Sequence, residues 1–426
     1  MTTLTTGTLI IGGGEAALHT AVALRAQGYD AGIMIAAEEP YSPYQRPPLS
    51  KAFLTGEADE YSLQLRADDY YLDNHIDLRT GSRITEVNIT ARGQGEAVTQ
   101  DGDTITFAKV VLATGATPRH LTIPGAEAEG VVYLRDIDSA RQLSRGLGEA
   151  RKVVVIGGGF IGLEAAAAAR MRGIEVTILE AGECLLGRVA APPISEFYRQ
   201  AHENRGATVM TGAAVTEIAV GEEGEVTGVI LADGQEIPAD LVVVGIGVIP
   251  NTALAQQLNL ECQRGILVDH AGRTRHPDIY AAGDCTQQPH PSLPGEVVCV
   301  ESVQNAAAQG KIVAASIVGN SLPAPQVPWF WSDQGDLKLQ IAGLSHGYDD
   351  YVLRGDPATE CFSLLYYRGN RLIAVDAINQ SHDFMAVRRA LSKNATIDPE
   401  RAGDTTVALK TLIQDDHVQN RNTVSA

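Results

Sequence analysis

A short apolar run that ends in closely spaced glycines restricts the fold of this chain more than any other feature. The run occurs first at Thr8–Ala17 and again at Lys152–Gly162. Each copy is followed by a helix-forming stretch that a glycine ends, and then by a second apolar run. This order of strand, turn, helix and strand is the βαβ unit of a parallel sheet, so the sequence predicts an α/β protein with two such units. The predicted helices and the strands after them cover residues 18–27 and 31–36 in the first copy, and 163–172 and 175–179 in the second.

The last part of the chain carries a different pattern, which predicts antiparallel strands. The expected strands are Leu337–Ala342, Cys361–Tyr367 and Arg371–Ile378, and a hairpin turn at Gly369-Asn370 joins the last two. Prolines at 323, 325 and 328 indicate a linker before this region. The residues after Leu412 are polar and without pattern, so we expect 413–426 to be a disordered tail. Further strands are predicted at 110–112, 227–231 and 241–244.

Composition excludes several classes of function. The chain has 426 residues, of which 44% are hydrophobic, enough for several folded domains. It has 33 basic and 52 acidic side chains, and the net charge of −19 argues against nucleic acid or an anionic membrane as a partner. No apolar run is long enough for a transmembrane helix, and the first basic residue is Arg25, so we expect neither a membrane span nor a signal peptide. Five scattered cysteines without C-x-x-C spacing fit a reducing cytoplasm and predict no metal site.

The first glycine motif predicts a dinucleotide site. Glycine at 12 and 14 and alanine at 17 permit a tight turn, through which backbone N–H groups at a helix N-terminus reach a pyrophosphate. An acidic residue after the second strand should hold a ribose. The candidates are Glu38 and Glu39, both slightly late in the sequence, and we favour Glu38. The alternative for Glu38 is a solvated loop charge.

The second motif repeats this logic with Gly157, Gly159 and Gly162. Glu180 stands at the end of the strand that follows the helix, where a carboxylate accepts hydrogen bonds from the ribose hydroxyls and repels a 2′-phosphate. The pattern therefore predicts NADH rather than NADPH. Arg188 follows shortly after and either contacts a cofactor phosphate or pairs with a surface acid.

Together with five further segments, these two motifs resemble the two-dinucleotide-fold flavoprotein reductases. The nearest group is that of the NADH-dependent ferredoxin reductases of the putidaredoxin reductase type, and the resemblance covers about residues 8–410. The further segments are Arg46–Lys51, Ala113-Thr114-Gly115, Ala282-Gly283-Asp284, Glu301–Ala306 and Pro328–Gln334.

The resemblance implies FAD at the first glycine motif and NADH at the second. It implies a discontinuous FAD-binding domain at 1–110 and 245–322, an NAD-binding domain at 111–244 and a C-terminal α+β domain at 323–412. Asp284 matches a residue that binds the flavin's ribityl and phosphate region. Lys51 and Glu164 match a lysine and a glutamate beside the flavin ring, and Trp331 matches an aromatic residue near it; these three are the expected catalytic residues. Trp329 is expected to be a packing residue. The remaining expected cofactor contacts are Arg46, Ala113, Thr114, Gly115, Gly283, Glu301 and Val303.

The resemblance also implies the direction of electron flow. Disulfide reductases of this wider fold carry two reactive cysteines on an early helix, but Leu49–Leu54 contains Ser50 and Lys51 and no cysteine. The acceptor is then external. The expected function is an FAD-dependent NADH:ferredoxin oxidoreductase, in which a hydride passes from NADH to FAD and single electrons go to a 2Fe-2S ferredoxin that supplies a haem monooxygenase or a ring-hydroxylating dioxygenase. The alternatives are an NADH oxidase, a rubredoxin or monodehydroascorbate reductase, and an NADH-sensing flavoprotein.

An acidic ferredoxin needs a local basic patch on this acidic protein. The candidate side chains either form that patch or belong to a solvated charged face, and they are Arg66, Lys311, Lys338, Arg388, Arg389 and Lys410.

Overall fold

The computed structural model describes residues 2–291, 293 and 295–415, and it divides the chain into two compact units. Unit 1 comprises Met1–Arg46, Ala58–Thr117 and Val248–Gln326, and unit 2 comprises Pro47–Glu57, Pro118–Gly247 and Val327–Ala426. Each unit is therefore assembled from three separate segments. Among the described residues, no helix combines the length and apolarity that crossing a membrane requires.

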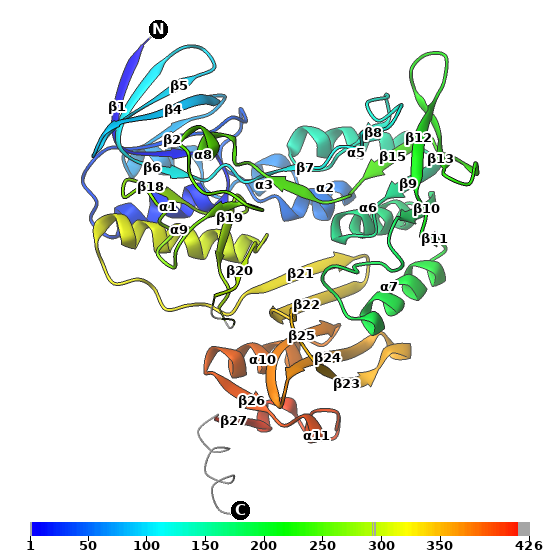
Figure 1. Ribbon diagram of the computed structural model, residues 1–426. Coiled ribbons are helices and arrows are strands. Elements are labelled where there is room, and N and C mark those ends of the chain that lie inside the picture. Colours follow the sequence, from blue (N-terminus) through cyan, green and yellow to red (C-terminus); the bar gives the residue numbers. More distant parts are fainter. Residues whose placement is uncertain (1, 292, 294, 416–426) are drawn as a thin grey trace, which may run out of the picture. The chain divides into compact units, whose positions relative to one another are not determined.

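Within the described ranges, unit 1 is built on a seven-stranded sheet with a parallel core (Figure 1). In sheet order the strands are β3 (Ile76–Arg79), β2 (Ile33–Ala36), β1 (Thr3–Ile11), β6 (Thr104–Leu112), β5 (Gln94–Thr99) and β4 (Ile84–Ala91), and β18 (Ile279–Ala281) also pairs with β6. Strands β1, β2, β3 and β18 run parallel to β6 or to each other, while β4 and β5 form an antiparallel meander on β6. The carboxyl ends of β1, β6 and β18 consequently lie side by side.

Two long helices of unit 1, α1 (Glu15–Ala26) and α9 (Val303–Val318), pack closely together. A Cβ atom at Gly310 would lie 2.8 Å from the carbonyl oxygen of Ala16, so only glycine permits this approach of the two helices. The remaining elements of the unit are α3 (Glu60–Leu63), α4 (Asp68–Asp73), β16 (Val248–Pro250), α8 (Ala253–Gln257), β17 (Ile266–Leu267), β19 (Thr286–Pro289) and β20 (Val297–Val298).

The described part of unit 2 contains a five-stranded parallel sheet and a five-stranded antiparallel sheet. The parallel sheet has the order β11 (Thr208–Thr211), β10 (Glu175–Glu180), β9 (Lys152–Ile156), β15 (Leu241–Val244) and β8 (Val131–Val132). Its helices are α5 (Ile137–Glu149), α6 (Phe160–Met171) and α7 (Pro192–Asn204), and a meander of β12 (Val215–Val220), β13 (Val226–Leu231) and β14 (Glu236–Pro238) lies beside it. The short β7 (Ala116–Pro118) precedes this region.

The antiparallel sheet contains the C-terminal strands that the sequence predicts. Its order is β21 (Trp329–Gln334), β22 (Leu337–Gly343), β25 (Arg371–Ile378), β24 (Cys361–Arg368) and β23 (Asp350–Asp356), and α10 (Ser381–Ser392) packs on β22 and β25. Short elements complete the region, namely η2 (Pro357–Thr359), β26 (Ala395–Ile397), α11 (Pro399–Ala402), η3 (Leu409–Thr411) and β27 (Ile413–Asp415).

Part of the expected tail forms a strand. Residues Ile413–Asp415 form β27, which pairs with β26, and Leu412 beside it is buried. Disorder from residue 413 is therefore wrong for these three positions, because a strand this short has no periodicity that a sequence pattern can reveal. Residues 416–426 lie outside the described part of the chain.

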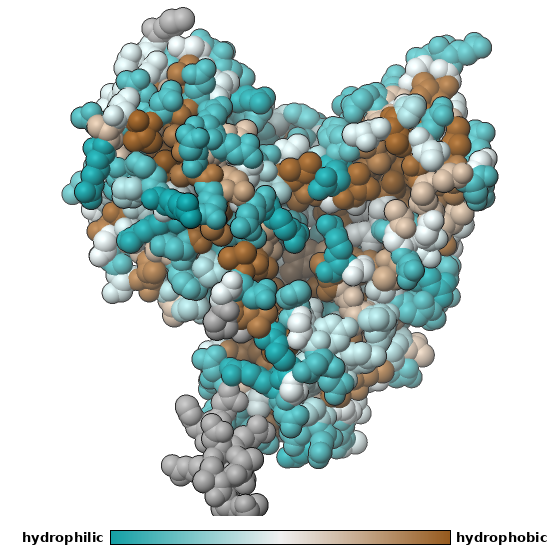
Figure 2. All heavy atoms as spheres, viewed as in Figure 1, coloured by the Kyte–Doolittle hydropathy of each residue, from teal (hydrophilic) through white to brown (hydrophobic). Residues whose placement is uncertain are grey.

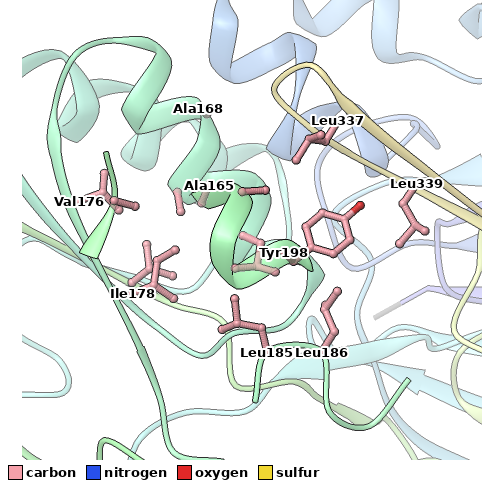
Figure 3. Close-up of a cluster of buried hydrophobic side chains, with 14 of the residues drawn as sticks. Ala165, Ala168, Val176, Ile178, Leu185, Leu186, Tyr198, Leu337 and Leu339 are labelled. Carbon is pink, nitrogen blue, oxygen red and sulfur yellow. The ribbon is translucent and has the colours of Figure 1, made fainter. Parts of the chain in front are cut away.

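One apolar cluster connects the two sheets of unit 2 (Figure 3). Val176 and Ile178 of β10 pack with α6, and Tyr198 of α7 lies among side chains of α6 and the β22 residues Leu337 and Leu339. The short segment η1 (Pro47–Ser50) and α2 (Ala52–Thr55) joins the same cluster through the buried Leu54. The face shown in Figure 2 carries mostly hydrophilic side chains, as the charge of the chain leads one to expect.

Candidate active site

The first glycine turn lies at the carboxyl ends of the parallel strands of unit 1. Gly12 has a φ of +124°, and a Cβ there would lie 2.1 Å from the carbonyl oxygen of Ala113, which follows β6. Gly14 is the N-cap of α1, and Ala17 is fully buried within the helix. A side chain at Gly12 would therefore separate β1 from β6, which explains why glycine is required there.

The neighbouring Ala113-Thr114-Gly115 turn is fixed by Asn251. The Thr114 hydroxyl donates to the Asn251 carbonyl at 2.7 Å, and the Asn251 side-chain amide donates to the Thr114 carbonyl at 2.8 Å. Gly115 takes a φ of +65°, and its carbonyl accepts from the Asn251 N–H at 2.9 Å. This turn therefore has a single conformation beside Gly12.

The third turn in this group is Ala282-Gly283-Asp284, directly after β18. Gly283 has a φ of +87°, and a Cβ there would lie 3.0 Å from that of Ala16 in the first turn of α1. Buried Gln309 of α9 accepts from the Gly283 N–H at 2.7 Å and also bonds to Thr286 and Gln288. The structure thus brings Asp284 to the glycine turn. Glu301, which is exposed, and the half-buried Val303 lie at the start of α9.

The two predicted acids after β2 have different environments. Glu38 is 67% exposed and pairs with Arg83 at 3.2 Å. Glu39 is held by Arg46, and Tyr44 donates to it at 2.5 Å, with the Arg46 guanidinium 5.1 Å from the Tyr44 ring. The predicted cofactor residue Arg46 is therefore joined to Glu39 rather than to Glu38.

The hydrogen bonds that close the two glycine turns show why both acids are late. Gly12 N–H donates to Ala36, and Gly157 N–H donates to Leu179. In this register Glu180 corresponds to Ala37, which a Cβ at Gly13 would contact. The first βαβ unit therefore has Ala37, and no acid, at the position that corresponds to Glu180. Glu38 and Glu39 lie one and two residues beyond this position.

The second glycine turn, in unit 2, has the same construction. Gly157 has a φ of +108°, and a Cβ there would lie 2.5 Å from the carbonyl oxygen of Gly245 after β15. A Cβ at Gly162 would lie 2.2 Å from the carbonyl oxygen of Gly157, so the third glycine permits α6 to pack against the turn. Gly159 is the N-cap of α6.

Glu180 is fixed on both carboxylate oxygens. Oε2 accepts from the Gly158 N–H at 2.6 Å, and Oε1 accepts from the Gly182 N–H at 2.7 Å. The carboxylate therefore lies directly beside the glycine turn. Arg188, on the exposed loop that follows, lies against Gly247, where a Cβ would be 3.1 Å from the guanidinium.

A buried ion pair lies elsewhere in unit 2. Lys51 Nζ is 2.7 Å from Glu164 Oε2, and the two side chains are 16% and 1% exposed. Ser50 also donates to Oε2, and Ser332 of β21 donates to Oε1 at 2.7 Å. Glu164 therefore has three donors from two distant segments, which offsets the cost of burying its charge.

The predicted aromatic residue Trp331 is half-buried on β21 and lies 5.7 Å from Trp329, centroid to centroid. Trp329 packs against Phe384 of α10, and the Arg388 guanidinium lies 4.9 Å from its ring. The contacts of Trp329 agree with its expected packing role.

The basic candidates for docking are distributed over both units. Lys338 alternates along β22 with the buried Leu337 and Leu339, so it lies on the sheet face that α10 covers. Arg389 is exposed on α10, and Lys410 is exposed on η3, which contacts α10. These three and Arg388 all belong to or surround α10. Arg66 and Lys311 are exposed in unit 1.

All five cysteines are free thiols. Cys285, next to Asp284, is completely buried, and burial raises the pKa of its thiol to about 11. A thiol with this pKa is protonated at neutral pH and unreactive. Cys184 is exposed on the loop after Glu180.

The two glycine turns fit dinucleotides. Helices α1 and α6 have no side-chain cap at Gly14 and Gly159. A Cβ at Gly14 would meet no atom within 4 Å, and one at Gly159 would meet only a carbonyl at 3.7 Å. No side chain caps either helix N-terminus, which is the arrangement that accepts a pyrophosphate in dinucleotide sites.

Sequence reasoning missed two buried polar side chains, one that bonds to the Gly283 turn and one on β21. Gln309 on α9 and Gln334 on β21 are both buried and hydrogen-bonded. One signal in the sequence could have found them, namely polar residues that recur on one face of an otherwise apolar element. In the helix these are Asn305 and Gln309, four residues apart, and in the strand they are Ser332 and Gln334, two residues apart.

Two family models match the chain. Residues 6–310 match the pyridine nucleotide-disulphide oxidoreductase model, and residues 329–413 match the reductase C-terminal model. The first covers well over half of the chain. The resemblance and the mixed α/β fold class that the sequence predicts are thereby confirmed.

Curated and solved relatives agree with this assignment over nearly the full chain. Rhodocoxin reductase of Rhodococcus erythropolis is 41% identical, covering 95% of this chain and 94% of the relative. Rubredoxin-NAD(+) reductase of Pseudomonas putida is 40% identical, covering 87% of this chain and 95% of the relative. The crystal structure of the covalent putidaredoxin reductase–putidaredoxin complex has a TM-score of 0.92 at 37% identity, covering 96% of this chain and 98% of that one.

The predicted enzyme class and the cofactors FAD and NAD(H) agree with these relatives, whereas the residue roles and domain boundaries remain predictions. With two uncapped glycine turns, the C-terminal sheet and these matches, the chain belongs to the pyridine nucleotide-disulphide oxidoreductase family.

Proposed function

We propose that this protein is an NADH-dependent ferredoxin reductase, which uses bound FAD to move electrons from NADH to a 2Fe-2S ferredoxin that supplies an oxygenase. FAD, when bound, provides the chemistry by accepting a hydride and returning electrons singly. The relatives named after rhodocoxin and putidaredoxin support this acceptor class.

One observation carries the proposal. In the segment where the resemblance places a redox-active dithiol in disulfide reductases, this chain has Ser50 and Lys51, and both are fixed on Glu164. This segment provides no disulfide to accept the electrons. The two electrons must therefore leave to an external acceptor, even though the family name refers to disulphides.

Lys51 has an electrostatic role in this proposal. Its ammonium group is mostly buried and paired with a carboxylate that three donors hold in place. A positive charge beside the flavin ring stabilises negative charge on the reduced ring. The placement of Lys51 and Trp331 at the ring rests on the resemblance.

The glycine turns and Glu180 position the nicotinamide nucleotide. The N-terminus of α6 accepts the pyrophosphate, and Glu180 offers the remaining lone pairs of its carboxylate to the ribose hydroxyls. In unit 1, the turn of Gly12 and Gly14 together with Asp284 holds the corresponding part of FAD.

Docking and location complete the proposal. The basic residues around α10 attract an acidic ferredoxin to an otherwise acidic protein. Five free and scattered thiols support a reducing, cytoplasmic location.

A second candidate is rubredoxin reduction, which the 40% identical rubredoxin reductase favours. The two candidates differ in the acceptor and share the NADH and FAD chemistry. The two candidates can be distinguished by measuring which added electron carrier speeds electron output. The same measurement separates both from a ferredoxin-independent NADH oxidase and from an NADH-sensing flavoprotein.

The test is a reduction assay on the FAD-loaded protein. NADH or NADPH is supplied as donor, cytochrome c reports electron output, and a panel of 2Fe-2S ferredoxins or a rubredoxin is added as carrier. We expect fast reduction only with NADH and a 2Fe-2S ferredoxin. Faster output with rubredoxin favours the second candidate, and NADH consumption by oxygen that no carrier changes contradicts both. Slow turnover with a long-lived reduced flavin indicates a sensor.

A further inference from the structure

A buried row of hydrogen-bonded side chains in unit 2 continues beyond the Lys51–Glu164 pair. Ser332 Oγ donates to Glu164 Oε1 at 2.7 Å, and Gln334 Nε2 donates to Ser332 Oγ at 3.3 Å. Gln334 Oε1 then lies 2.8 Å from His202 Nε2 on α7. Ser332, Gln334 and His202 are 0%, 1% and 3% exposed, so water cannot replace these bonds. The row joins α6, β21 and α7 within one apolar cluster, to which Tyr198, one turn before His202, belongs (Figure 3).

The carboxylate fixes the direction of every bond in this row. An ionised carboxylate only accepts, so the single Ser332 hydroxyl hydrogen points at Glu164. Ser332 Oγ must then accept from Gln334, which turns the amide nitrogen toward Ser332 and the amide oxygen toward His202. His202 must in turn donate through Nε2–H. One negative charge therefore determines an amide orientation and a histidine tautomer that lie two and three residues away along the row.

The row holds the Glu164 carboxylate in one orientation. Bonds that all point toward a carboxylate polarise one another, so each bond in the row strengthens the next. Burial lowers the pKa of His202, so the far end of the row is a neutral imidazole rather than a competing cation. Without the Ser332 hydroxyl, Oε1 would lose its donor, and both remaining donors, Ser50 and Lys51, would lie on Oε2.

We propose that Ser332, Gln334 and His202 are positioning residues that keep Glu164 pointed at Lys51, and thereby hold in place the charge that Lys51 presents to the flavin. The row itself follows from the contacts of unit 2, whereas its effect on the flavin rests on the proposed function. None of the three is assigned a role by the resemblance.

The experiment compares three variants of the FAD-loaded protein. Ser332→Ala removes the donor, and Ser332→Thr retains a hydroxyl. Ser363→Ala is the matched control, because buried Ser363 also donates to a buried, ion-paired carboxylate, Asp383, at 3.1 Å. The flavin midpoint potential is measured by reductive titration, and histidine NMR reports the His202 tautomer, assigned with His202→Gln.

We expect Ser332→Ala to weaken the stabilisation of the reduced flavin about tenfold, which is a shift of about 30 mV to more negative potential for a two-electron couple. His202 should change from a single Nε2–H tautomer to a mixture, because Gln334 is then free to turn over. Ser332→Thr should restore both readouts. Ser363→Ala should lower the melting temperature and leave the potential and the tautomer as in the wild type.

An unchanged potential in Ser332→Ala, or an equal shift in Ser363→Ala, overturns the inference. If Ser332→Ala shows the expected shift but the wild type fails to reduce any ferredoxin, the proposed function alone is contradicted. Protein that takes up no FAD also contradicts the proposed function. The tautomer readout then decides the row, and an unaltered His202 in Ser332→Ala overturns it.

Discussion

The carboxylate of Glu180 has no freedom to leave the glycine turn, since a backbone N–H holds each oxygen. In the proposed nucleotide site, a 2′-phosphate on the ribose would meet this fixed negative charge, and Glu180 could not swing away to relieve the repulsion. The rigidity of the side chain, and not only its charge, should therefore decide which nicotinamide nucleotide binds.

Replacing Glu180 by Ser should lower kcat/KM for NADH and raise it for NADPH, changing the preference by about tenfold to hundredfold, as expected when a charged hydrogen-bonding partner of the ribose is lost. Steady-state kinetics with both donors measures the ratio. Glu175→Ser, at the exposed start of the same strand, is the control and should leave it unchanged. An unaltered ratio in Glu180→Ser would refute the assignment.

Asp376 is a buried acid of the C-terminal sheet, and its burial makes the stability of the folded protein depend on pH. Burial raises its pKa from the ordinary 3.8 to about 7, while the Tyr366 hydroxyl, which donates to it at 2.5 Å, opposes the rise. The folded protein thus holds this proton more tightly than the unfolded chain. Stability from this group is present at low pH and is lost as the pH rises from about 4 to about 7, at roughly 1.4 kcal/mol per pH unit.

Asp376→Asn should abolish that loss, because an amide does not ionise. The melting temperature of the wild type should therefore fall relative to that of Asp376→Asn between about pH 4 and pH 7. Tyr366→Phe, which removes a bond to the carboxylate, should extend the fall to higher pH. Parallel melting curves of wild type and Asp376→Asn over this range would contradict the pKa shift.

Which single side chains can be foreseen depends on their distance from a motif. Glu180 follows from the strand it ends, and the structure places it at the glycine turn. Spacing alone favours Glu38, but the register shows that Ala37 occupies the strand end and that Arg46 holds Glu39. Ser332 and Gln334 contact Glu164 and His202 only through the fold, so no local pattern could pair them.

The first turns of α1 and α6 differ at one position that matters for packing. The third motif residue is Ala17 in α1, fully buried and accommodated, and Gly162 in α6, where a Cβ would lie 2.2 Å from a carbonyl oxygen. Helix α6 therefore packs more tightly against its turn than α1 does.

The single substitutions Gly162→Ala and Ala17→Gly should have unequal effects on stability and on nucleotide binding. Gly162→Ala must move the α6 turn and should cost about 1–3 kcal/mol of stability while weakening NADH binding. Ala17→Gly should cost about 1 kcal/mol from helix propensity and leave the flavin bound. Thermal unfolding and NADH titration measure both effects. Equal losses of NADH affinity in the two variants would contradict the packing argument.

Elements with strong periodicity were predictable and others were not. The two βαβ units and the hairpin of β24 and β25 appear where the glycines and apolar runs indicate them. The meanders of β4 and β5 and of β12 to β14 were missed in large part, because half-exposed strands with mixed polarity resemble loops in sequence. The inclusion of Pro47–Glu57 in unit 2 depends on tertiary contacts alone.

Because the chain has a net charge of −19, we propose that its encounter with an acidic ferredoxin depends on a few basic side chains. Arg389 is exposed on α10 beside Arg388, and long-range attraction between such groups and an acidic partner raises the association rate and fades with added salt.

Arg389→Glu should lower kcat/KM for ferredoxin about tenfold at low ionic strength and leave NADH reduction of a small acceptor such as ferricyanide unchanged. The salt dependence of the ferredoxin rate should become shallower. Arg92→Glu, an exposed charge reversal in unit 1, changes the net charge equally and serves as the control. A similar loss in both variants would mean that total charge, and not α10, governs the encounter.

The buried carboxylate of Glu164 also imposes an order on the assembly of unit 2 during protein synthesis. Its partners Ser50 and Lys51 leave the ribosome before it, and Ser332 emerges 168 residues after it, on the order of ten seconds later at typical elongation rates. Until β21 arrives, one oxygen of a side chain destined for the interior has no protein donor. A nascent chain stalled before residue 332 should thus keep α6 accessible to water, to chaperones and to proteases.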